Sequence, residues 1–171
     1  MALFNTIEEI REYIPVNISF SFTEIEPLLD SCEVEFIQDI LGQVEYVSLE
    51  NNFQDNTLSP AQEELLIYCR KALAWLVYAK WVPVGNIQVT AGGFQVPSGS
   101  NMAPASQWRV NAFEHECYKN GFNNLELLLY FLWNSDEGTY PDWESSDEYA
   151  AHREFLILSA KEIQRDVDIN S

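Results

Sequence analysis

The segment SPAQEELLIYCRKALAWLVYAKW, residues 59–81, decides the fold of this chain. Ser59 is placed to cap a helix, a proline fills the first helical position, and Gln62 stands three residues after the cap. These signals predict a helix that runs to about Trp81 and ends before Pro83. Its apolar positions form a wide stripe: Leu65, Leu66, Tyr68, Cys69, Ala72, Leu73, Leu76 and Ala79. A helix this apolar indicates the centre of a helical core.

The period of the sequence changes in residues 86–97, just after this helix. Apolar and polar residues alternate on both sides of Gly92-Gly93, which predicts a β-hairpin with a glycine-rich turn. Two strands alone are only marginally stable, so the hairpin must pack on helices or pair with another chain. We expect it to project from the bundle and to contact a neighbouring subunit. The apolar candidates for that contact are Ile87, Val89, Phe94 and Val96.

Further helices are predicted toward the C-terminus. One runs over about 104–120 and is ended by Gly121, and a very apolar one covers 125–133. Residues 134–148 read as an acidic loop, and a last helix follows over about 147–166. The residues expected to cap the second and third of these helices are Asn123-Asn124 and either Ser145 or Ser146.

Capping boxes mark the helices of the N-terminal part. Thr6 with Glu9 opens a short helix that reaches Arg11 or Glu12, and Pro15 stops it. Residues 16–22 are expected to be an extended connector. The next helix covers about 23–41, with Thr23 and Glu26 as its capping box and Gly42 at its C-terminal end; residues 43–58 read as a polar linker.

The length of 171 residues, with 47% hydrophobic residues, fits one globular domain that spans 1–171. The predicted fold class is mainly α: a bundle of about five to six helices with the hairpin 86–97 projecting from it and the acidic loop 134–148. No apolar run approaches the length of a membrane-spanning helix. The three cysteines lack any close spacing, so we expect reduced, buried thiols.

The charge is strongly acidic, with 27 Asp and Glu against 9 Lys and Arg, and residues 1–69 contain a single base, Arg11. Phosphate repels such a chain, which excludes DNA or anionic membrane binding through a broad face. Four uses of the acids stay open: mimicry of nucleic acid, a conduit in which DNA slides, contact with basic neighbours, or simple solvation. The candidate surface acids, which lie off the apolar stripe, are Glu24, Glu33, Glu35 and Asp39.

The sequence contains no recognisable catalytic, metal-binding or nucleotide-binding motif. The neighbours of His115 and His152 are not spaced to share a metal ion, and no nucleotide-binding motif occurs. We therefore expect no metal, no cofactor and no enzymatic activity, although so many acids always supply carboxylate pairs. Trp143 stands in the acidic loop, where it either contacts a partner or folds back over the end of the bundle.

A set of motifs recurs in a known order along the chain. It comprises LFNTIEEIREYIPVN (3–17), GFQV (93–96), APASQW (103–108), NNLELLLYFLW (123–133), YPDW (140–143), SSDEYAAHREFLILSAKEI (145–163) and DINS (168–171). This order resembles a helical family found in phages and prophages of gut bacteria, crAss-like phages among them. Members of that family are similar to the head–tail connector (adaptor) proteins of tailed phages.

This resemblance implies a structural virion protein at the neck, assembled in the host cytoplasm. Such connectors form homo-oligomeric rings below the portal, contact portal and tail or neck proteins, and let double-stranded DNA pass without specific binding. An acidic protein suits that role, because attractive phosphate contacts would slow passage. The alternative function is an acidic DNA mimic that inhibits a DNA-binding protein, and an enzyme with an acid pair is a third possibility.

Overall fold

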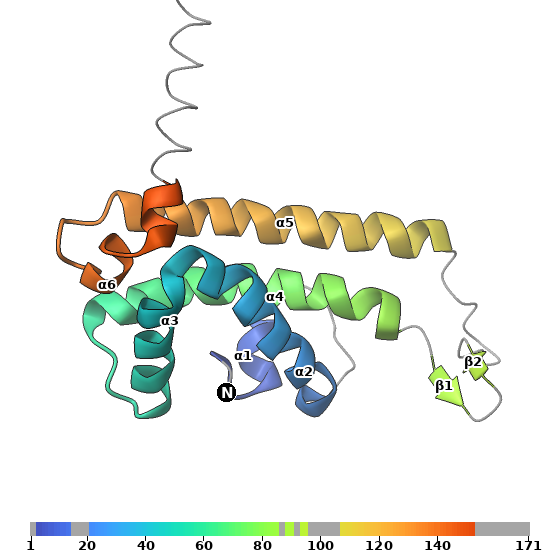
Figure 1. The fold of residues 1–171 in the computed structure, drawn as a ribbon. Helices are drawn as coiled ribbons and strands as arrows, with labels where there is room; N and C mark the ends of the chain where they lie inside the picture. Colours follow the sequence, from blue (N-terminus) through green and yellow to red (C-terminus); the bar gives the residue numbers. More distant parts are fainter. Residues whose placement is uncertain (1–2, 15–20, 86–87, 91–92, 96–106, 153–171) are drawn as a thin grey trace, which may run out of the picture.

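The computed structural model describes residues 3–14, 21–85, 88–90, 93–95 and 107–152 (Figure 1). Helices dominate these residues, which confirms the mainly helical prediction. The elements are α1 (Ile7–Arg11), α2 (Phe22–Cys32), a π-helix η1 (Glu33–Ile37), α3 (Gln38–Gln54), α4 (Pro60–Gly85), β1 (Gln88–Thr90), β2 (Gly93–Gln95), α5 (Gln107–Trp133) and α6 (Pro141–Glu144). Within the described residues, no helix combines the length and apolar character needed to cross a membrane.

The two long helices α4 and α5 run side by side and form the length of the bundle (Figure 1). Helices α1 and α2 pack against α4, and α3 contacts η1 and α6. The wide apolar stripe of α4 is buried as predicted, with Leu65, Cys69 and Leu73 fully inside. Burial of such side chains contributes roughly 1.5–3 kcal/mol each. The α4 helix is therefore the centre of the core.

The start of α4 follows the sequence prediction and its end does not. The Ser59 hydroxyl accepts a hydrogen bond from the Gln62 N–H at 3.2 Å, and the Gln62 side chain accepts one from the Ser59 N–H at 3.2 Å. At the other end the helix continues through Pro83 to Gly85. A proline removes one backbone hydrogen bond and crowds the preceding turn, but here it falls in the last turn, where little helix remains to be disrupted.

The α5 helix is continuous over 27 residues, so the predicted break at Gly121 to Asn124 is wrong. Gly121 lies against α4: a Cβ atom there would stand 2.6 Å from the Leu76 Cγ and Cδ2 atoms. The Asn124 side chain donates to the Asn120 carbonyl at 2.8 Å instead of capping a new helix. Glycine is thus required at 121 for the close approach of two helices rather than for a helix end.

The segment from α2 to α3 departs from the prediction in two places. The N-cap of α2 is Ser21, whose N–H donates to Glu24 Oε2 at 2.9 Å, and the expected box of Thr23 and Glu26 is displaced by two residues. Gly42 does leave helical geometry, with φ of 74° and ψ of 158°. The chain then returns at once to a helix through Gln54, so the predicted polar linker 43–58 is mostly helical.

The N-terminal segment is held firmly on the bundle. Thr6 caps α1 with the predicted reciprocal capping box to Glu9. Leu3, Phe4, Ile10 and Ile14 are all at most 2% exposed, so the residues around α1 belong to the core.

Two short strands lie in the connection between α4 and α5. β1 and β2 pair antiparallel, with Gln88 opposite Gln95 and Val89 opposite Phe94. Among the predicted contact residues, Ile87 and Val96 lie outside the described part of the chain.

The predicted acidic loop 134–148 contains the short helix α6 and two buried aromatic residues, Tyr140 and Trp143. Its end follows the prediction, because the Ser146 hydroxyl accepts a hydrogen bond from the Tyr149 N–H at 3.0 Å and caps the helical turn that follows. The rest of that predicted helix, from 153 onward, lies outside the described residues.

Candidate functional site

The four predicted surface acids are not equivalent in the structure. Glu24, Glu35 and Asp39 are exposed, but Glu33 is completely buried, so its place among the surface acids is wrong. The reason is the π-helix that begins at Glu33: its wider turn changes which positions face the core. Glu35, by contrast, forms an ion pair with Lys80 at the surface.

Glu33 is the centre of a buried polar group, the Glu33 cluster, formed by Leu3, Glu33, Tyr46 and Arg70. One Glu33 oxygen accepts from the Leu3 N–H at 2.6 Å, and the other accepts from the Tyr46 hydroxyl at 2.9 Å. Burial raises the pKa of Glu33 to about 7, although both hydrogen bonds oppose that shift. Burial and the nearby Glu33 charge also raise the pKa of Tyr46.

Arg70 completes the Glu33 cluster from α4. Its Nε atom donates to the Leu3 carbonyl at 2.7 Å, and its Nη2 atom lies 3.1 Å from Glu9 Oε1. The guanidinium also lies 5.0 Å from the Phe4 ring centre and 4.8 Å from the Phe53 ring centre. The Glu33 cluster therefore ties the N-terminal segment to three helices, which is a structural role.

Trp143 folds back into the bundle and is 2% exposed, so it is not available as the predicted subunit contact. Its indole Nε1–H donates to the Ile40 carbonyl at 3.0 Å, just before the Gly42 kink. The buried Glu45 carboxylate accepts from the Trp143 backbone N–H, and burial raises the pKa of Glu45. The kink and α6 thus hold each other in place.

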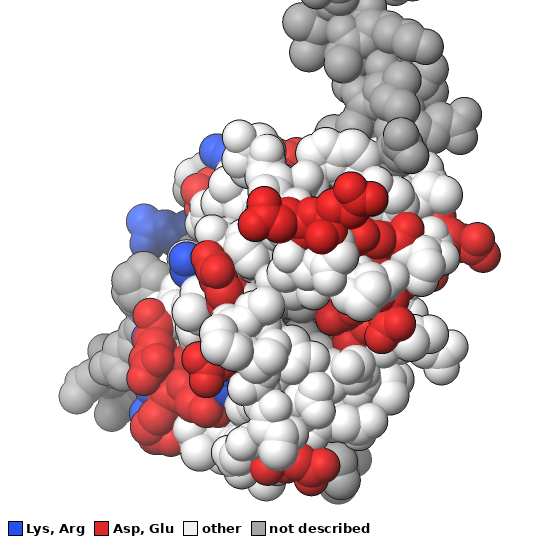
Figure 2. Space-filling model, turned by 90° about the vertical axis from the view of Figure 1, so that its left-hand side faces the viewer, with Lys and Arg blue, Asp and Glu red and all other residues white. Residues whose placement is uncertain are grey.

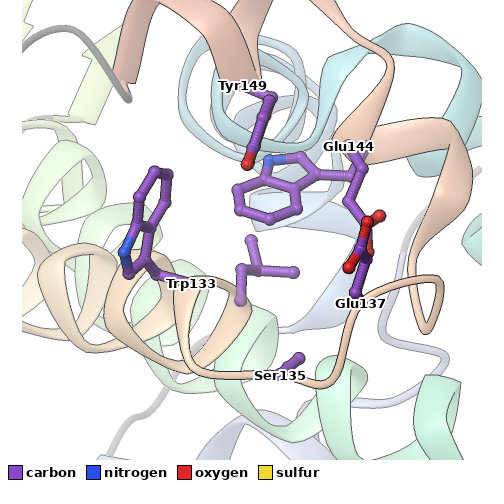
Figure 3. Close-up of a pocket in the computed structure, with 7 residues that line it drawn as sticks. Trp133, Ser135, Glu137, Glu144 and Tyr149 are labelled. Carbon is purple, nitrogen blue, oxygen red and sulfur yellow. The ribbon is translucent and has the colours of Figure 1, made fainter.

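A pocket of about 440 Å³ opens beside α6, and we call it the α5–α6 pocket. Its lining residues are Leu132, Trp133, Ser135, Glu137, Trp143, Glu144 and Tyr149. Figure 3 shows the Trp133 indole on one side, Glu137 and Glu144 on the other, and the Tyr149 hydroxyl pointing into the space between them. This is an open site with aromatic walls and an acidic edge.

The rings of this pocket support one another. Trp133 and Tyr149 are stacked, with centroids 5.5 Å apart and planes at 23°. Trp143 meets Tyr149 edge to face at 4.8 Å. The sequence predicted a very apolar helix over 125–133 and an acidic loop over 134–148, and it did not predict that Trp133 and the two acids line one pocket. Pro141, which begins α6, was the one local signal that this loop contains a helix.

The charge is concentrated at the same end of the bundle. Residues 43–69 contain five acids and residues 120–152 contain seven, and neither range contains a Lys or Arg. Figure 2 views the molecule from this side and shows Asp and Glu in several patches, with few Lys or Arg in sight. Lys80 and Arg109 lie on the parts of α4 and α5 nearer the strands. The acid-rich end would attract a cationic partner.

The described histidines and cysteines, which could take part in catalysis or metal binding, do not come together at one site. Within the described chain, no group of His, Cys, Asp or Glu could hold a metal ion. His115 is exposed on α5, and His152 lines another groove with Phe36 and Leu129. Cys32, Cys69 and Cys117 are buried free thiols, as predicted, and burial raises the pKa of each.

Comparison with known proteins identifies the family and little beyond it. Neither the curated proteins nor the solved structures contain a match to this chain. A family model does match, over residues 37–153, a range that begins at the end of η1 and includes α3, α4, α5, α6 and the α5–α6 pocket. The chain therefore belongs to DUF6712, a family of unknown function.

Proposed function

We propose that this protein is a structural, non-enzymatic subunit of a head–tail connector (adaptor) ring below the portal of a tailed phage. Its partners in this proposal are copies of itself, the portal protein, and tail or neck proteins. Its location is the neck of the virion, and double-stranded DNA passes through the ring without specific binding. The proposal rests on the resemblance of the sequence motifs together with the architecture.

The observation that carries the proposal is the antiparallel strand pair in the connection between the two long helices. β1 and β2 follow the end of α4 and precede α5, and Figure 1 draws them past the end of α4 and apart from both helices. An edge strand in such a position has unpaired backbone groups that favour pairing with another chain. This supports a hairpin that projects from one subunit and contacts the next one in a ring.

The charge distribution supports passage of DNA. A ring repeats the acid-rich end of each subunit around its axis, and the carboxylates that are not paired with bases would repel phosphate.

The buried acids support a structural, non-enzymatic role as well. Glu33 and Glu45 are both occupied by hydrogen bonds that hold backbone segments together, rather than open to a substrate.

Oligomeric state tests this proposal. Native mass spectrometry and negative-stain electron microscopy of the full chain should show closed rings, formed alone or on addition of a portal ring. Changing Ile87, Val89, Phe94 and Val96 to Ser should abolish the rings while circular dichroism still shows a folded helical protein. The matched control changes Val34 and Val44, which are 60% and 64% exposed on other elements, to Ser. Rings that survive the first variant, or a chain that stays monomeric at high concentration with portal present, would refute the proposal.

The alternative is an acidic DNA mimic, which the absence of any Lys or Arg from residue 12 to 69 favours. A mimic would be a monomer or dimer that forms a stoichiometric complex with a DNA-binding protein. Double-stranded DNA would compete for that complex, and raising the salt concentration would weaken it, because exposed charges are screened beyond about 8 Å at physiological salt. Size measurement with and without competitor DNA therefore separates the two functions.

A further inference from the structure

We propose that the α5–α6 pocket binds the guanidinium group of an arginine side chain presented by a protein partner. The proposal concerns a specific side-chain site and does not depend on the connector function. It rests on three features of the pocket: its aromatic walls, its two carboxylates, and the charge around it.

The aromatic walls provide faces on which a planar cation can stack. Trp133 is 37% exposed, although tryptophan is usually buried, and its ring lies along the pocket instead of in the core. The Tyr149 ring stacks on one side of the Trp133 ring, and the Trp143 ring packs edge to face against Tyr149. A cation over an indole face is attracted by the ring, and arginine uses this contact more often than lysine.

The two carboxylates give the pocket its polarity. Glu144 accepts from the Gly138 N–H through both oxygens, at 2.8 and 3.1 Å, which fixes its position on the edge of the pocket. Glu137 is exposed and lines the same pocket (Figure 3). Among the described residues, neither carboxylate has an ion-pair partner. Two carboxylates that line one pocket repel each other, and a guanidinium bound there would offset both negative charges.

The described residues at this end of the bundle do not supply a cation to the pocket. Its lining residues all lie within 132–149, and neither 120–152 nor 43–69 contains a Lys or Arg. The volume of about 440 Å³ lies within the roughly 300–1,000 Å³ of ordinary ligand pockets, so it is large enough for a side chain. The acid-rich end of the bundle would also raise the encounter rate of a basic partner.

The test is a titration of the full chain with N-acetyl-arginine methylamide, followed by the indole signals in ¹H–¹⁵N NMR spectra. We expect saturable shifts of Trp133 and Trp143 with a dissociation constant on the order of 1 mM. N-acetyl-lysine methylamide should bind about threefold more weakly, since it lacks the planar fork. N-acetyl-citrulline methylamide, which has the same shape without the charge, should bind about tenfold more weakly or not at all.

Variants of the pocket locate the site. Trp133→Leu should weaken arginine binding about three- to tenfold, and Glu137→Gln about two- to fivefold. The matched controls are Trp108→Leu, an exposed tryptophan at the other end of α5, and Asp136→Asn, the exposed acid beside Glu137. Neither control should change the affinity by more than about 1.5-fold, because neither residue lines the pocket. If Trp133→Leu fails to fold, Glu137→Gln at the surface still decides the test.

Three results would overturn the proposal. The first is the absence of any saturable shift of Trp133 with the arginine probe. The second is equal binding of the citrulline probe, which would show an apolar pocket without a preference for cations. The third is an equal loss of affinity in Asp136→Asn and Glu137→Gln, which would show general attraction to an acidic protein.

Discussion

The Glu33 cluster and the α5–α6 pocket are built from the same kinds of side chain, carboxylates beside aromatic rings, but they differ in what completes them. In the Glu33 cluster, both carboxylate oxygens are used by the same chain and Glu33 is fully buried. In the pocket, Glu137 is exposed and the Trp133 face is partly open. The Glu33 carboxyl is occupied by hydrogen bonds inside the fold, whereas an acid beside an open aromatic face is available to a partner.

The largest effect on the free energy of unfolding should come from Trp143, the buried floor of the α5–α6 pocket. Trp133, which forms its partly exposed rim, should matter less. Trp143→Ala removes a buried indole and its hydrogen bond to the Ile40 carbonyl, and we expect a loss of about 3–5 kcal/mol in the free energy of unfolding. Trp133→Ala at the partly exposed rim should cost about 1 kcal/mol. Urea unfolding of the two variants measures both values, and equal losses would contradict the division into floor and rim.

The second prediction concerns the pH dependence of the Glu33 cluster. The pKa of Glu33 is about 7 in the folded protein and about 4.3 in an unfolded chain. The folded state therefore holds more protons between these values, and the contribution of Glu33 is fully present below about pH 4 and is lost as the pH rises through about 7. The loss amounts to about 4 kcal/mol.

Glu33→Gln should remove this pH dependence, because the amide does not titrate. The variant should match the wild type near pH 4.5 and exceed its stability by up to about 4 kcal/mol at pH 8. Glu35→Gln, at the exposed position two residues away, is the control and should show no such difference. Urea unfolding across this pH range checks the prediction, which a pH-independent gap between Glu33→Gln and wild type would contradict.

Arg70 tests whether the N-terminal segment depends on the Glu33 cluster. Arg70→Met keeps the aliphatic stem but leaves the Leu3 carbonyl without its donor, and we expect a loss of about 1–3 kcal/mol. Hydrogen exchange should show faster opening of residues 3–14 than of α4 itself. Equal protection in these two regions would mean that apolar packing of Leu3 and Phe4 alone holds the segment.

The smallest effect on folding should come from the acids at the edge of the pocket. Glu137→Gln should change the free energy of unfolding by no more than about 0.5 kcal/mol, with a slight gain at low salt, because it relieves repulsion from Glu144. The melting temperature at low and high salt measures this. A clear destabilisation would assign Glu137 to the support of the fold and weaken the contrast with Glu33.

Local signals account for the parts of the fold that the sequence predicted. The helix starts at Thr6 and Ser59 depend on contacts within three residues, so they are visible in the sequence itself. The stripe of α4 is likewise a periodic pattern, and the absence of bases from 43–69 and 120–152 is a property of composition. Each of these features is present before the chain folds.

Tertiary packing decided the rest. Glu33 is buried because Leu3, 30 residues earlier, supplies its N–H, and Trp143 is buried because a carbonyl 103 residues earlier accepts its indole N–H. Gly121 resembles a helix end in sequence, yet its lack of a side chain leaves room for Leu76 on the neighbouring helix. Contacts over such separations leave no periodic or capping pattern, because their geometry exists only when α3, α4, α5 and α6 have packed. The pocket that combines Trp133, Glu137 and Tyr149 arises in the same way.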